Sequence, residues 1–245
     1  KAELGALGYS RDNQPGKKQI VFGIETGMNG VPSGLTIQKG NVCDKKHFNF
    51  MLKISGKILE KGSLLIFDCG RNTEENKDKI IELGFNYLTL KPRHRETYKN
   101  YVKIYKESPK EVFYINGTRY ECVKVKDENL KYIFHSKNLY KKLRKNRNKK
   151  FQRDLKIGDK ILSKINKGKP IGEHISREGN IILKGEIQTS LSEIVNPFIT
   201  GFEGFFVLES SVDDESYKIL KLYKNKDIVE KLIRNMKEGT ELRPI

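Results

Sequence analysis

Cysteine, histidine and long apolar runs are all scarce in this chain of 245 residues. The three cysteines lie far apart and form no C-x-x-C pair, which indicates a reducing compartment and excludes a zinc knuckle. The four histidines stand at no metal-ligand spacing. No run approaches the roughly 18 apolar residues of a membrane-spanning helix, and the sequence contains no signal-peptide pattern. We therefore expect a cytoplasmic protein without a membrane partner.

Acidic residues are in the minority. The chain has 48 Lys and Arg against 31 Asp and Glu, a net charge of +17, which favours polyanions, and nucleic acid before membrane. Residues 137–156 hold ten basic side chains and one acidic side chain, Asp154. We interpret this segment as a basic helix that contacts the DNA backbone without reading bases, the alternative being a solvated face. Its candidate DNA-binding residues are Lys141, Lys142, Arg144, Lys145 and Arg147.

The first 92 residues predict an α/β fold with a mixed sheet flanked by helices. Strands are predicted at 19–26, 34–38, 63–67 and 87–90, and helices at 44–59 and 73–83. The run SLLIF at 63–67 is continuously apolar, which is typical of a strand covered on both faces. Residues 1–92 form the first part of the core in this interpretation.

From residue 93 the pattern changes, and we assign 93–203 to an insertion and 204–245 to the last part of the core. The insertion predicts a helix at 93–111, a hairpin at 113–125 that turns at Asn116-Gly117, and a third strand. A long basic helix at 139–165 and Gly-rich turns at 168–200 follow. The core then resumes with a strand at 204–211 and a final helix.

The final helix is predicted to have one polar face. At about 100° per residue, Tyr223, Lys226, Glu230, Arg234 and Lys237 fall on one side, and apolar residues occupy the other. One carboxylate thus lies within a stripe of cations and a phenol. A solvated amphipathic helix with i,i+4 ion pairs is the alternative interpretation.

Two acidic residues are candidates for a shared site. Asp68 follows the predicted strand 63–67 at its C-terminal end, where open α/β sheets carry their site residues. Glu230 lies on the final helix. Two carboxylates brought together suit Mg²⁺ (or Mn²⁺), which takes oxygen ligands and supports displacement at phosphorus. The alternative for Asp68 is a loop residue that caps the next turn.

The spacing Tyr223-x2-Lys226-x3-Glu230-x6-Lys237 resembles the Y-R-E-K signature of insertion-sequence transposases with a DDE catalytic triad. Lys226 departs from it, because the family usually has Arg there, whose bidentate fork Lys lacks. The segment VEKLIRNMKEGTELRPI is similar to the family's VE..FR.LK..L.LRPI, and Phe67-Asp68 with Gly70 resembles its strand-end Asp motif. The resemblance covers most of residues 1–92 and 204–245.

This resemblance implies an RNase H-like fold with a β-rich and basic-helix insertion before the last catalytic helix. It implies DNA strand cleavage and transfer for transposition of an insertion sequence, with Asp68 and Glu230 as catalytic residues and metal ligands. The DNA-binding residues implied beside them are Tyr223, Lys226, Arg234 and Lys237. The implied partners are double-stranded DNA, as transposon ends and target, and a second copy of the chain in the complex with DNA. The implied location is the nucleoid.

The family's first catalytic Asp is expected on a strand that precedes residue 1. No acidic residue before position 19 lies in a comparable context. Asp68 and Glu230 are therefore two of three acids, and we expect the chain alone to be inactive and, with an open strand edge, prone to aggregate. The alternatives are a truncated or decayed transposase that only binds DNA, and an RNase H-like metal-dependent nuclease.

Overall fold

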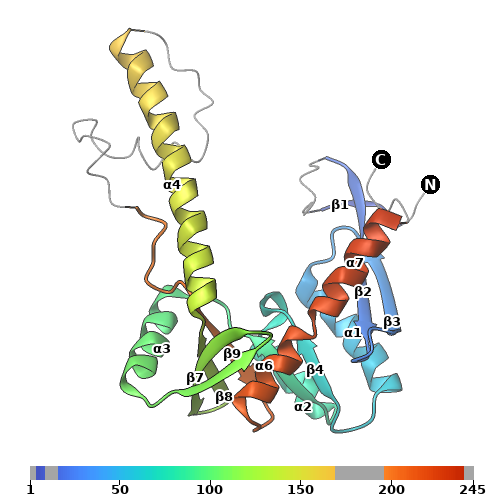
Figure 1. Cartoon of the computed structure of the whole chain (residues 1–245). Coiled ribbons are helices and arrows are strands. Elements are labelled where there is room, and N and C mark those ends of the chain that lie inside the picture. Colours follow the sequence, from blue (N-terminus) through green and yellow to red (C-terminus); the bar gives the residue numbers. More distant parts are fainter. Residues whose placement is uncertain (1–3, 9–15, 169–195, 240–245) are drawn as a thin grey trace.

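The computed structural model describes residues 4–8, 16–168 and 196–239, which form the predicted α/β fold with a mixed sheet (Figure 1). The strands are β1 (Ala6–Leu7), β2 (Lys18–Thr26), β3 (Pro32–Lys39), β4 (Leu64–Phe67), β5 (Asn86–Leu90), β6 (Glu111–Ile115), β7 (Thr118–Lys126), β8 (Leu130–His135) and β9 (Phe205–Ser210). The helices are α1 (Asp44–Ile58), the 3₁₀ turn η1 (Cys69–Arg71), α2 (Glu74–Glu82), α3 (Arg95–Glu107), α4 (Lys137–Asn166), α6 (Ser216–Lys224) and α7 (Asp227–Gly239). The turns predicted at 168–200 lie almost entirely outside the described residues.

Six strands form one mixed sheet in the order β4-β5-β9-β8-β7-β6. β4 and β5 run parallel, and α2 provides the crossover connection that a parallel pair needs. The other neighbouring pairs of this sheet are antiparallel. β4 therefore lies at one edge of the sheet and β6 at the other.

The sheet buries both faces, because side chains along each strand point alternately to opposite sides. In β8, Tyr132 and Phe134 pack in a cluster with Leu220 of α6. Ile133 between them packs on the opposite face, in a cluster with the tyrosines of α3. The buried tyrosines of α3 are Tyr98, Tyr101 and Tyr105.

β4 contacts core on both faces, as its continuous apolar run predicts. Leu64 and Ile66 pack against the cluster beneath α6, whereas Leu65 and Phe67 pack in a separate cluster with α1 and α2. Leu64, Leu65 and Ile66 are only half-buried, however, since β4 has a strand neighbour on one side only. The C-terminal end of β4, where Asp68 follows, is thus fixed from two faces.

The β2–β3 hairpin belongs to a second sheet, in the order β1-β2-β3. The helix α1 ties it to the larger sheet: His47 of α1 is 2.6 Å from the Thr36 hydroxyl of β3, and Phe48 of α1 packs on Phe67 of β4. Among the described residues, no strand lies between β2 and β4. β4 therefore has a strand partner on one side only, and β2, which lies between β1 and β3, is paired with β1 only at Lys18 and Gln19.

The predicted insertion, residues 93–203, supplies α3, β6, β7, β8 and α4. Its hairpin turns at Asn116 and Gly117, whose φ angles of 48° and 71° are those of the predicted type I′ turn. β8 pairs with β9, so the strands of this segment extend the sheet of the first 92 residues. The insertion is thus continuous with the core through its strands.

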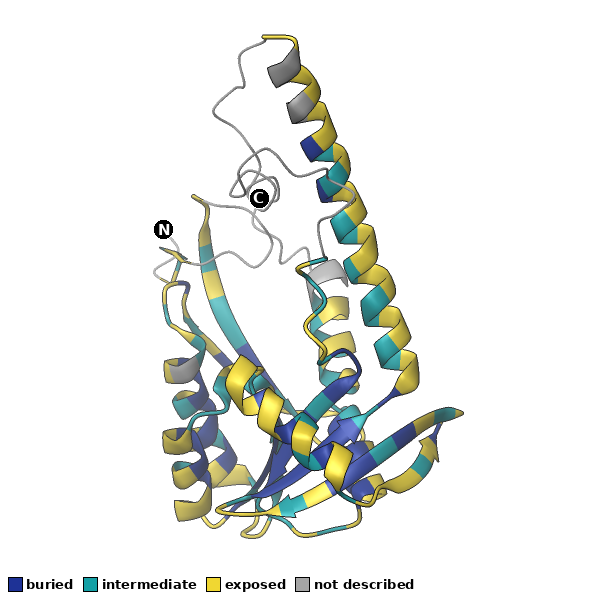
Figure 2. Ribbon diagram, turned by 90° about the vertical axis from the view of Figure 1, so that its left-hand side faces the viewer, coloured by how far each residue is buried: buried dark blue, intermediate teal, exposed yellow. Residues whose placement is uncertain are grey.

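The basic helix α4 contains 30 residues and is about 45 Å long at ideal rise. It begins directly after Ser136 and projects away from the sheet (Figure 1), and residues coloured as exposed occur along its length (Figure 2). No helix in the described ranges combines the length and the apolar character needed to cross a membrane.

Candidate functional site

Asp68 stands directly after β4 and directly before η1. Its carboxylate is more than half exposed, at 59% of its side-chain surface. Burial would raise the pKa of Asp68, but the hydrogen bond and charge of Lys226, with Arg71 nearby, outweigh burial and lower it below the ordinary value. Asp68 is therefore an anion at neutral pH, held at the C-terminal end of a core strand.

Lys226 joins the two acids that the sequence singles out. Its Nζ atom lies 2.9 Å from Asp68 Oδ1 and 2.9 Å from Glu230 Oε1. Both oxygens contact the same nitrogen, so they lie no farther apart than twice that distance. The fold thus brings Asp68 and Glu230 together, although Lys226 and Asp68 are 158 positions apart in the chain.

Tyr223 completes the cluster from α6. The side chain is buried, and its hydroxyl donates to Asp68 Oδ1 over 3.5 Å. Burial in particular, and also the charge of Asp68, raise the pKa of Tyr223, so the phenol keeps its proton at neutral pH. Its ring also lies 5.4 Å from the Lys226 ammonium, so Tyr223 contacts both charges of this ion pair.

The prediction of one continuous final helix is wrong. The structure has two helices, α6 and α7, and Asn225 and Lys226 form a turn between them. The Asn225 and Lys226 amides donate to carbonyls three residues earlier, the tighter pattern of a 3₁₀ turn. The single polar face predicted for one ideal helix is therefore interrupted at this point. Lys226 lies in the turn, and its side chain reaches Asp68.

The two cations predicted farther along lie on α7. Arg234 is exposed and follows Glu230 by one helical turn. Lys237 lies in the last turn of α7, and its side chain lies outside the described part of the structure. Among the described side chains, Arg234 is not part of the direct contact that joins Asp68, Lys226 and Glu230.

α7 runs alongside β2 (Figure 1), and its first turn meets the β2–β3 turn. Gly30 in that turn has a φ of 78°, and a Cβ atom built there would lie 2.7 Å from Cγ2 of Ile228. Only glycine suits both the left-handed backbone and this close approach. The cluster therefore lies where the end of β4, the α6–α7 turn and the β2–β3 turn meet.

The donor chemistry of Asp68 and Glu230 fits a hard divalent cation, since each carboxylate supplies oxygen ligands. Burial would lower the pKa of Lys226, but its bonds to the two carboxylates raise it, so the ammonium is charged at neutral pH. Among the described residues, no group of three or more His, Cys, Asp and Glu side chains is placed to hold a metal ion. Water and phosphate oxygens, which Mg²⁺ commonly keeps as ligands, would add to these two carboxylates.

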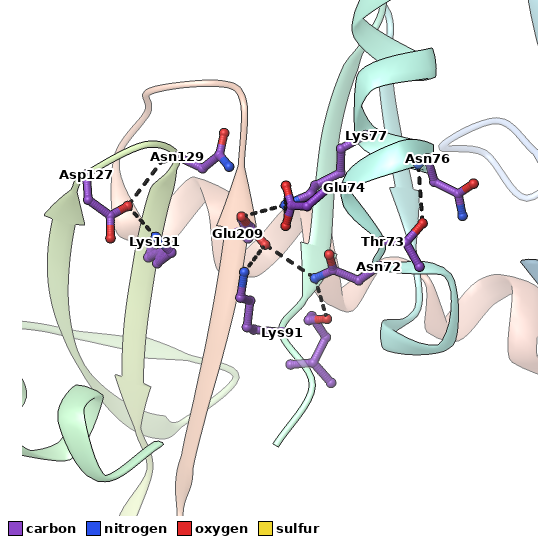
Figure 3. Close-up of polar contacts among 11 residues, drawn as sticks. Asn72, Thr73, Glu74, Asn76, Lys77, Lys91, Asp127, Asn129, Lys131 and Glu209 are labelled. Carbon is purple, nitrogen blue, oxygen red and sulfur yellow. Dashed lines mark hydrogen bonds and ion pairs between the residues drawn. The ribbon is translucent and has the colours of Figure 1, made fainter. Parts of the chain in front are cut away.

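A buried ionic network behind η1 is not apparent from the sequence (Figure 3). Glu209 of β9 is fully buried, and its two oxygens accept from Lys77 Nζ at 2.9 Å and Lys91 Nζ at 3.0 Å. Asn72, the residue after η1, donates to Leu90 O at 3.1 Å and to Glu209 Oε2 at 3.4 Å. This network fixes the segment that carries Asp68. The only signal in the sequence is a glutamate inside the apolar run GFFVLESS.

On α4, basic side chains line one open groove of about 960 Å³. The exposed cations along it, which we name the basic stripe, are Lys141, Lys145, Lys149, Arg153 and Lys156. None of them forms an ion pair with an acid of the described residues. The first four members follow i,i+4 spacing and Lys156 follows Arg153 at i,i+3, so the stripe lies along one side of the helix.

Three other predicted DNA-binding residues of α4 are placed differently. Arg144 lies in the groove but stacks on Tyr140, with its guanidinium carbon 5.5 Å from the ring centroid. Lys142 is exposed beside the stripe. Arg147 points to the turn before β9, where it donates to Glu203 and to Thr200.

Comparisons of the chain with protein-family models, curated proteins and solved structures found no match. The function of the Asp68–Glu230 cluster and of the basic stripe therefore has to be inferred from their own chemistry and placement.

Proposed function

We propose that the chain is the core of a DDE transposase that cleaves and transfers DNA strands, with a divalent metal ion held by Asp68 and Glu230. The observation that carries the proposal is the double ion pair of Lys226, which brings the two acids of the resemblance to one point. When bound, Mg²⁺ or Mn²⁺ would stabilise the charge that develops on a phosphate during in-line displacement. The proposed location of such a protein is on the nucleoid.

The order of elements supports the RNase H-like part of this proposal. A hairpin, a helix, a strand, a crossover helix and a parallel strand follow one another from β2 to β5. Asp68 follows the first strand of the parallel pair, and Glu230 comes from a helix near the end of the chain. Site residues at the C-terminal ends of parallel strands are the general arrangement of open α/β sheets.

The chain's own residues have distinct roles in this proposal. Asp68 and Glu230 supply carboxylate oxygens, and Tyr223 holds Asp68 in place through its buried hydroxyl. Lys226, Arg234 and Lys237 supply positive charge that attracts the phosphates of a DNA strand. The side chains of Asp68 and Glu230 are 59% and 55% exposed, which leaves room for a large substrate beside them.

The basic stripe on α4 is proposed to contact the phosphate backbone of double-stranded DNA, as transposon end or target. Its cations have no acidic partner among the described residues, so they repel one another until an anion binds. The helix carries no motif that reads bases in the grooves of DNA, so its surface suits contact with the phosphate backbone without base recognition. A second copy of the chain on the same DNA belongs to this proposal as well.

The experiment is strand cleavage on transposon-end DNA, in a protein that also carries the first acid expected from the resemblance. Glu230→Gln and Asp68→Asn should each abolish Mn²⁺-dependent cleavage and leave DNA binding intact. Glu82→Gln is the matched control, because Glu82 is exposed at the end of α2. Cleavage that persists in both site variants would disprove the assignment.

A second candidate function is DNA binding without catalysis, which is supported by the cations of the basic stripe that have no acidic partner among the described residues. A decayed transposase of this kind would bind DNA through the basic stripe and cleave nothing, even with the first acid restored. An RNase H-like nuclease would instead cleave DNA but fail to join a transposon end to a target.

A further inference from the structure

We propose that Lys226 is the internal counter-ion of the Asp68–Glu230 pair, and that a divalent cation has to displace its ammonium in order to bind there. This inference rests on the proposed function, because it takes the pair to be a metal site. It gives Lys226 a positioning role, in addition to the phosphate contact that the resemblance implies.

The contacts place the ammonium at the point where a cation would neutralise both acids. Lys226 Nζ lies 2.9 Å from one oxygen of each carboxylate. The Lys226 side chain is 24% exposed, less than half the exposure of either carboxylate. The Lys226 side chain as a whole is therefore less exposed than either acid, and both acids open outward to solvent.

The backbone of the α6–α7 turn holds Lys226 in this position. The Lys226 amide donates to Tyr223 O at 3.3 Å, and the Lys226 carbonyl accepts from Glu230 N at 3.2 Å. The Tyr223 ring lies beside the ammonium, 5.4 Å away. Since the residue is fixed at its backbone and the side chain has a long stem, only the ammonium has to move when a metal ion arrives.

Charge and size explain why the two cations exclude each other. One ammonium offsets only one of two carboxylate charges, so the pair keeps an attraction for a second positive charge. A Mg²⁺ ion would approach the same oxygens to about 2.0–2.1 Å, inside the position of the ammonium. Two cations in contact with the same oxygens repel each other strongly, so Lys226 competes with the metal while it keeps the acids close.

The test is Mn²⁺ binding to the chain itself, followed by the electron paramagnetic resonance signal of free Mn²⁺. Lys226→Met keeps the unbranched stem, one atom shorter, and removes the competing charge, so it should tighten Mn²⁺ binding about three- to tenfold, the size of two exposed ion pairs. Lys226→Arg keeps the charge and adds a bidentate fork, so it should bind Mn²⁺ no more tightly than the unchanged chain. Asp68→Asn should remove this Mn²⁺ binding. The double variant of Asp68→Asn and Lys226→Met should show no gain in Mn²⁺ affinity.

Lys231→Met is the matched control. It removes a lysine from α7 whose ammonium is 2.8 Å from Asp227, outside the cluster, and should leave Mn²⁺ affinity unchanged. Circular dichroism confirms that each variant is folded. Equal or weaker Mn²⁺ binding by a folded Lys226→Met variant would overturn the counter-ion role and leave the metal site standing. Absence of any Mn²⁺ binding that depends on Asp68 would overturn the metal site as well.

Discussion

Glu209 and Lys77 form an ion pair that is almost completely withdrawn from solvent, with 2.9 Å between Oε1 and Nζ. The side chains are 0% and 3% exposed. They join β9, which follows the insertion, to α2, which precedes it, and so connect parts of the chain that lie 132 positions apart. Because Asn72 bonds to the same carboxylate, the pair also supports the segment that carries Asp68.

Removing Glu209 should be strongly destabilising. Glu209→Leu leaves the buried Lys77 ammonium with only the exposed Glu74, 2.7 Å away, and loss of one member of a buried pair costs about 3–5 kcal/mol. Urea denaturation should show this fall in the free energy of unfolding. Glu128→Leu makes the same change at an exposed turn position and should alter stability by less than about 0.5 kcal/mol. Equal stability of the two variants would show that the network does not hold the fold.

Acid should weaken the same network. Burial would raise the pKa of Glu209, but hydrogen bonds and charges from Lys77 and Lys91 lower it below its ordinary value. A carboxyl whose pKa is lowered on folding stabilises the protein above its unfolded pKa, and this stabilisation is lost as pH falls through the folded pKa. Between neutral pH and about pH 3, urea denaturation should therefore show a smaller loss of unfolding free energy in Glu209→Gln than in the unchanged chain. Parallel profiles of unfolding free energy against pH for the two proteins would contradict this prediction.

Neutralising the basic stripe should reduce the salt dependence of DNA binding. Each phosphate contact contributes about 0.9 to the slope of log affinity against log salt concentration, so three substitutions should lower the slope by about 2–3. The measurement is fluorescence anisotropy with DNA duplexes of unrelated sequence. The salt slope should fall by the same amount for each duplex. The stripe variant carries Gln at Lys141, Lys145 and Lys149. The control with the same charge change carries Gln at the exposed Lys57, Lys103 and Lys106. An equal effect of the two triple variants would show that only net charge matters.

Arg147 should behave differently from its neighbours on α4. Its guanidinium donates to the buried carboxylate of Glu203 and is directed away from the basic stripe. Arg147→Ala should therefore lower the free energy of unfolding by about 1–3 kcal/mol, as expected when a buried charged acceptor loses a partner. The salt slope of DNA binding should stay unchanged. A reduced slope with unchanged stability would instead place Arg147 among the DNA contacts.

Local sequence patterns were sufficient for most elements of the fold. The alternation and turn chemistry around Asn116-Gly117 predict the β6–β7 hairpin, and both residues have the positive φ that this turn requires. The apolar run before Asp68 predicts β4 and places the acid at its end. These features depend on neighbours within a few residues, so the sequence carries them directly.

The break between α6 and α7 could not be read from the same patterns. The spacing of Tyr223, Lys226, Glu230 and Arg234 fits one continuous helix, whereas the bonds of the folded backbone reveal the turn. The break matters for the candidate site, because it places Lys226 between Asp68 and Glu230. The Glu209 network was missed for a related reason, since its members come from three separate segments.

The sequence by itself determined where most strands, the β6–β7 turn and the basic helix occur, and it identified Asp68 and Glu230 as candidates for one site. Tertiary structure alone decided that these two acids share one ammonium, that Arg147 faces a buried glutamate, and that β8 pairs with β9. The physical reason is that hydrogen bonding and hydrophobic spacing along a segment are local. Ion pairs and strand partners between distant segments are selected only when the whole chain packs.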